Sequence, residues 1–114
     1  MNVYEESHRL ARAIKESEEY KQFQALKDRV EENPEIASMI HDFESKKMSM
    51  QMKQMTGEIS QQSLQQQMQE IYQIVMRDPL AAEYIQAQMR FSLMMKDVYE
   101  ILGDAMGIGK PFGV

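Results

Sequence analysis

The chain has 114 residues, a length that suits one domain around a single core. It contains no cysteine, which excludes disulfides, thiolate metal sites, thiolate-held iron–sulfur clusters and cysteine nucleophiles. The formal net charge is −5, with Lys and Arg scattered among Asp and Glu, and this balance disfavours a surface for nucleic-acid phosphates.

The N-terminus and the hydropathy pattern predict a cytoplasmic protein. Glu5 and Glu6 stand where a secretory signal would carry positive charge. The apolar runs are only a few residues long, whereas a membrane-crossing helix needs roughly 20. We therefore expect no membrane association.

Composition and periodicity predict an all-α protein. Glycine and proline are few, and the chain is rich in the helix-favouring residues Glu, Gln, Lys, Leu, Met and Ala. We expect about five helices and no strand, in a small antiparallel bundle with a long central helical hairpin and a long C-terminal helix. Residues 1–106 are expected to form a single helical domain, and the glycine-rich residues 107–114 a flexible C-terminal tail.

The first two expected helices cover residues 3–16 and the segment from Glu18 to the Asn33-Pro34 pair. Ser17 separates them as a break and an N-cap, because its hydroxyl can accept a first-turn amide. The residue before a proline is pushed out of helical geometry, so the second helix ends at Asn33. The apolar stripes of these helices consist of Val3, Ser7, Leu10 and Ile14, and of Tyr20, Phe23, Leu26 and Val30.

The remaining helices are bounded by similar signals. Asn33-Pro34 starts the third helix, which we expect to end near Gly57, and Asp78-Pro79 starts the fifth, which extends to about Met106. The fourth helix lies between them. Their apolar stripes are Ile36, Met39, Ile40, Phe43 and Met50; Leu64, Met68, Ile71, Tyr72 and Val75; and Leu80, Tyr84, Ala87, Phe91, Met95, Val98 and Leu102.

The third helix carries a second apolar stripe. At 100° per residue, Met48, Met52 and Met55 fall roughly opposite the stripe of Ile36, Phe43 and Met50. One interpretation is a partner interface formed by Met48, Met52, Met55 and Ile59, since flexible methionine side chains adapt to several shapes. We expect an identical copy to cover it, giving a homodimer. The alternative is a methionine-rich core.

Catalytic and metal-binding patterns are absent from the sequence. His8 and His41 lack a second histidine or carboxylate at metal-binding spacing, and no nucleophile stands beside a base. We therefore expect no metal, no cofactor and no enzymatic activity. Lys46, Lys47 and Lys53 lie in a stretch without acidic residues and are the candidates for RNA contact.

The order of segments resembles a known family. Residues 13–23 (AIKESEEYKQF), Asn33-Pro34, residues 40–43 (IHDF), residues 91–95 (FSLMM) and Ile101-Leu102 are similar to the YlbF/YmcA family of bacterial proteins, most of all its YheA-like branch, over about residues 3–106. The resemblance implies an all-helical fold and self-association. For the YlbF and YmcA branches it also implies a complex with a third protein that modulates ribonuclease Y, and with it competence, sporulation and biofilm formation.

The same resemblance leaves two functional hypotheses. Those complex-forming branches are associated with a cysteine-held iron–sulfur cluster, which this cysteine-free chain cannot hold. Our leading hypothesis is a non-enzymatic protein-interaction module, self-associating and binding an unidentified protein partner. The alternative is an RNA-associated regulator that acts with a complex of the ribonuclease Y type.

Overall fold

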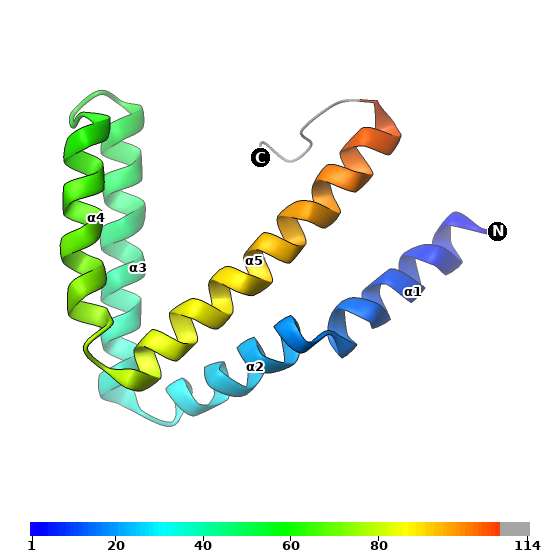
Figure 1. Cartoon of the computed structure of the whole chain (residues 1–114), viewed down its shortest axis with the longest axis horizontal. Helices are drawn as coiled ribbons and strands as arrows, with labels where there is room; N and C mark the ends of the chain where they lie inside the picture. The colour runs from blue at the N-terminus through cyan, green and yellow to red at the C-terminus, as the bar shows by residue number, and fades with distance from the viewer. Residues whose placement is uncertain (108–114) are drawn as a thin grey trace. The chain divides into compact units, whose positions relative to one another are not determined.

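The protein is all-α. The computed structural model describes residues 1–107 and contains, in chain order, α1 (Val3–Glu16), α2 (Glu18–Glu31), α3 (Pro34–Met55), α4 (Gln61–Val75) and α5 (Pro79–Met106) (Figure 1). No strand occurs within residues 1–107. The predicted fold class and the five helices are confirmed, while α2 ends at Glu31, two residues before the predicted Asn33. Of the predicted tail, residues 108–114 lie outside the described residues.

Side-chain caps set the helix starts. The Asn33 side chain accepts the amide of Ile36 at 3.3 Å, and the Asp78 side chain accepts the amide of Ala81 at 2.9 Å. Ser17 accepts the amide of Tyr20 at 3.2 Å and has extended backbone, so it ends α1 and starts α2 as predicted. Gly57 follows α3 with a φ of +83°, a left-handed conformation that costs glycine little.

The chain divides into two compact units. One, which we call the hairpin unit, is Lys27–Tyr84; the other, the terminal unit, is formed by Met1–Leu26 together with the described part of the segment from Ile85. The divisions fall inside α2 and inside α5. The single domain over residues 1–106 stays a prediction.

The hairpin unit is built on α3 and α4, which run antiparallel and lie side by side (Figure 1). The ring of Phe43 on α3 meets the ring of Tyr72 on α4 edge-on, with centroids 5.0 Å apart. This geometry is favourable for aromatic pairs. The core side chains of the unit are Val30, Ile36, Ile40, Phe43, Met50, Val75, Ala81 and Tyr84. The predicted central helical hairpin is therefore confirmed.

In the terminal unit, α2 meets α5 through aromatic side chains. Phe91 on α5 stacks on Phe23 with ring centroids 5.6 Å apart, and lies 5.7 Å from the ring of Tyr20. Beside them, the Arg90 guanidinium donates to the Gln22 side chain at 3.2 Å. All three aromatic residues belong to the apolar stripes predicted for these helices. The periodicity of the sequence therefore predicted which sides of α2 and α5 face each other.

Candidate protein-binding surface

The inner face of α3 belongs to the core of the hairpin unit. Ile36, Ile40, Phe43 and Met50 are only 4–8% exposed. They recur at three-, four- and seven-residue steps, which places them on one side of the helix. The burial of the inner face of α3 is therefore what the sequence pattern predicts.

The outer face of α3 is apolar and exposed. Met48 is 64% exposed, Met52 61% and Met55 82%. Ile59, in the turn that follows α3, is half-buried. We call Met48, Met52 and Met55 the methionine face. These three side chains do not belong to the core of this chain, whereas Met50, which lies between them in sequence, does.

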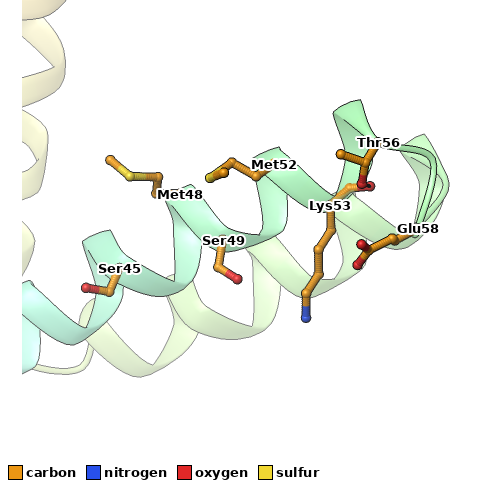
Figure 2. Close-up of a pocket in the computed structure, with 7 residues that line it drawn as sticks. All are labelled: Ser45, Met48, Ser49, Met52, Lys53, Thr56 and Glu58. Atoms are coloured by element: carbon orange, nitrogen blue, oxygen red, sulfur yellow. Dashed lines mark hydrogen bonds between the residues drawn. The ribbon is translucent and has the colours of Figure 1, made fainter.

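An open groove runs along the methionine face towards the tip of the hairpin (Figure 2). Its volume is about 460 Å³, and its lining residues are Ser45, Met48, Ser49, Met52, Lys53, Thr56 and Glu58. Met48 and Met52 project side by side from α3, while Lys53 and Glu58 lie at the end nearest the turn (Figure 2). The small serines leave space beside the long thioether chains, and opposite charges occupy one end.

The three candidate RNA-contacting lysines do not share one side of α3. At 100° per residue, Lys46 and Lys53 lie near each other on the helix surface, but Lys47 lies about 100° or more away from both. Lys46 forms an ion pair with Asp42 at 3.0 Å, and Lys47 is half-buried. The pairing partly neutralises the local positive charge. RNA contact through these residues stays a prediction.

A second open groove, which was not predicted from the sequence, lies between α3 and α4. Gln51 of α3 and Leu64, Gln65, Met68, Gln69 and Tyr72 of α4 line it. Leu64, Met68 and Tyr72 belong to the predicted core stripe of α4, yet all three are only half-buried. Glutamines at 65 and 69 flank that stripe, and this mixed apolar and amide pattern was the signal for a partly open face.

The fold changes the ionisation of Tyr84. Tyr84 is 8% exposed and lies on the part of α5 that belongs to the hairpin unit. Burial raises the pKa of the Tyr84 phenol, and the negative charges of Glu44 and Glu31 raise it further. The phenol therefore stays neutral well into the alkaline range, and it has the character of a core side chain with a polar end.

The described residues offer no cluster for metal binding. Within residues 1–107, no three His, Asp or Glu side chains come together in a way that could hold a metal ion. His8 and His41 are both exposed. The expected absence of a metal and of a cofactor stays a prediction.

Comparison with known proteins places these features in a family. The model of the family described as control of competence regulator ComK, YlbF/YmcA, matches residues 3–107, which include all five helices and the methionine face. This chain belongs to the YlbF/YmcA family. The family predicted from the sequence is thereby confirmed, and its description refers to control of a competence regulator. As for membranes, none of the helices in residues 1–107 combines the length and apolarity needed to span one.

Among the relatives of this YlbF/YmcA-family chain are several bacterial UPF0342 proteins. The protein STH1710 of Symbiobacterium thermophilum is 34% identical over 110 residues, which is 96% of this chain and 98% of the relative. The protein DSY2926 of Desulfitobacterium hafniense is 34% identical and covers 99% of this chain and 91% of its own length. A relative in Caldicellulosiruptor bescii is also 34% identical, over 92% of this chain and 88% of its own. The likeness therefore extends over most of the length of these relatives.

Proposed function

We propose that this YlbF/YmcA-family chain is a non-enzymatic protein-interaction module of the cytoplasm, and that its methionine face binds another protein. The observation that carries the proposal is the exposure of three methionines, 61–82% each, on the side of α3 opposite its buried face. Scattered apolar side chains are ordinary on protein surfaces, but contiguous ones mark interaction sites.

The chemistry of the groove fits a protein partner better than a small molecule. The groove is open along its length and is lined by one helix and the turn after it. Small-molecule sites are instead concave and enclose most of the ligand. A helix or extended segment could lie along Met48 and Met52, and each buried large apolar side chain contributes roughly 1.5–3 kcal/mol.

Regulation by binding is the role consistent with the family. The family description refers to control of a competence regulator, and the resemblance of the sequence to the YlbF and YmcA branches implies assembly with other proteins. Neither requires catalysis. Because the chain has no cysteine, any such assembly would form without a thiolate-held iron–sulfur cluster.

Affinity capture from the native cytosol, followed by mass spectrometry, tests this proposal with three versions of the chain. The wild type is compared with Met52→Glu, which puts a charge on the methionine face, and with the matched control Gln66→Glu at an exposed position of α4. We expect wild type and Gln66→Glu to retain the same partner, and Met52→Glu to lose it by roughly 10-fold or more, because an unpaired charge would be buried. Capture that is identical for all three proteins would contradict the proposal.

Titration with single-stranded RNA separates this proposal from the RNA-associated regulator. We expect negligible RNA binding at physiological salt. RNA affinity that falls steeply with salt, and that falls again when Lys46 and Lys53 are changed to Gln, would favour the alternative.

A further inference from the structure

The methionine face contains the oxidisable side chains that the hairpin unit exposes. The sequence has no cysteine and no tryptophan, so the thioether sulfurs of methionine are the groups that peroxide oxidises. Met48, Met52 and Met55 are 61–82% exposed, whereas Met50, between them in sequence, is 8% exposed. The remaining methionines of the unit are half-buried: Met39, Met68 and Met76. Within the hairpin unit, an oxidant therefore meets the methionine face first.

The three exposed methionines are neighbours on the helix surface. Met55 is the last residue of α3, and the steps from Met48 to Met52 and from Met52 to Met55 are four and three residues. At 100° per residue, these steps place the side chains in a stripe roughly 60° wide, in which neighbouring Cβ atoms are about 5–6 Å apart. Met48 and Met52 project side by side (Figure 2). Oxidation of all three therefore changes one continuous face.

Oxidation replaces an apolar group with a polar one. The methionine sulfur attacks hydrogen peroxide, the O–O bond breaks, an S–O bond forms, and the second oxygen leaves as water with both protons. The sulfur loses two electrons and the peroxide gains them. The sulfoxide oxygen accepts hydrogen bonds from water, so covering it with an apolar surface costs free energy. Methionine sulfoxide reductases reverse the step: two thiols become a disulfide, and the sulfoxide oxygen leaves as water.

The folded state does not depend on the thioethers of the methionine face. Ile40, Phe43 and Met50 of α3 pack in the core of the hairpin unit and lie on the other side of the helix. A change at an exposed position away from the core alters the free energy of unfolding little. Oxidation of the methionine face should therefore leave the chain folded.

We propose that the methionine face is a redox-sensitive switch: peroxide oxidises Met48, Met52 and Met55, and the folded chain loses its apolar face until the sulfoxides are reduced. The consequence for a partner rests on the function proposed above. A bound partner covers the sulfurs, so oxidation acts on the free chain. Oxidation and partner binding then oppose each other, because each disfavours the state that the other requires.

Peroxide treatment of two full-length proteins tests the switch without a partner. One is the wild type, and the other carries Met48→Leu, Met52→Leu and Met55→Leu. The leucine variant keeps an apolar face of similar volume that peroxide does not oxidise, and it retains every other methionine as background. Retention on a hydrophobic-interaction column reports exposed apolar surface, peptide mass spectrometry locates the sulfoxides, and circular dichroism reports helix content.

We expect oxidised wild type to elute clearly earlier than untreated wild type, and the leucine variant to shift much less. Sulfoxide should form at Met48, Met52 and Met55 roughly 10-fold faster than at Met50, with no loss of helical signal. Methionine sulfoxide reductases A and B with dithiothreitol should restore the retention time. The proposal is overturned by equal shifts in the two proteins, by oxidation of Met50 as fast as the face, by loss of helix, or by failure of the reductases to restore retention.

Capture from the native cytosol measures the consequence for a partner. Untreated, oxidised and reductase-treated wild type serve as bait after the peroxide is removed. We expect oxidised wild type to lose the partner by roughly 10-fold or more, reductase treatment to recover it, and the leucine variant to keep it after peroxide. Undiminished capture by oxidised wild type overturns the switch. A lack of any partner on untreated wild type contradicts the proposed function alone, and the chromatography then decides on the switch.

Discussion

Met50 and Met52 are two residues apart on α3 and serve opposite purposes. At 100° per residue, their side chains leave the helix about 200° apart. Met50 is 8% exposed among the core residues of the hairpin unit, whereas Met52 is 61% exposed and lines the groove. Position on the helix, and not residue type, decides whether a methionine is buried in the core or exposed on the face proposed to bind a partner.

Alanine substitution of these two methionines should separate the two roles. Met50→Ala should lower the free energy of unfolding by about 2–5 kcal/mol, because it leaves a cavity in the core. Met52→Ala should change it by less than about 0.5 kcal/mol, since the side chain is exposed. Urea denaturation of both variants and the wild type measures this. Equal losses for the two substitutions would mean that both side chains are buried in the folded chain.

Tyr84 should make stability fall at alkaline pH. Its pKa is raised in the folded state by burial and by the negative charges of Glu44 and Glu31. The folded chain therefore holds the phenol proton more tightly than the unfolded chain. The resulting contribution of Tyr84 to the free energy of unfolding is present below the unfolded pKa of about 10 and is lost as the pH rises through the folded pKa. Ultraviolet titration of the tyrosines should show a late-ionising group that is absent from Tyr84→Phe. A titration curve whose alkaline end is the same in Tyr84→Phe as in the wild type would contradict the raised pKa of Tyr84.

Helix boundaries in this protein are decided by single polar side chains. The Asn2 side chain accepts the amide of Tyr4 at 2.8 Å, and that of Ser60 accepts the amide of Ser63 at 3.0 Å. Asp78 serves α5 in the same way, next to a proline whose fixed φ suits the first turn. Each cap satisfies an amide that the helix itself leaves unpaired.

Removal of the cap of α5 should have a measurable cost. We expect Asp78→Ala to lower the free energy of unfolding by about 1 kcal/mol, because the amide of Ala81 loses its acceptor. Asp78→Asn should restore most of the loss, since the amide oxygen of asparagine caps as well. Thermal denaturation monitored by circular dichroism gives both values. If Asp78→Asn is destabilised as much as Asp78→Ala, the loss of stability does not come from the missing helix cap.

The boundaries were predictable because caps and prolines act locally, within three or four residues of the chain. The facing sides of helices were also predictable, as for Phe23 and Phe91, since periodicity reveals an apolar stripe. The sequence did not predict which part of the protein, if any, covers each stripe. The stripe of α1 reads in sequence like that of any core helix, yet the structure leaves it exposed. The half-open face of α4 was missed for the same reason, because periodicity does not report how deeply a stripe is buried.

At the scale of the whole molecule, exposed apolar side chains occur in both units of the described residues 1–107. They include the methionine face on the hairpin unit and residues of α1 and α5 in the terminal unit. On the function proposed above, a YlbF/YmcA-family protein would act by binding a partner through the methionine face. Its regulatory role would then follow from binding alone.

Methionine oxidation is the most direct test of whether the methionine face is covered in the cell. Brief peroxide treatment, with sulfoxide mapped by mass spectrometry, is compared between the purified protein and cells that carry it at native level. In the purified protein, Met48, Met52 and Met55 should oxidise much faster than the buried Met50, and Met1, the most exposed methionine, provides the reference. We predict that in cells these three become protected by several-fold relative to Met1. Oxidation of Met48, Met52 and Met55 at the same relative rate in cells as in the purified protein would contradict the account.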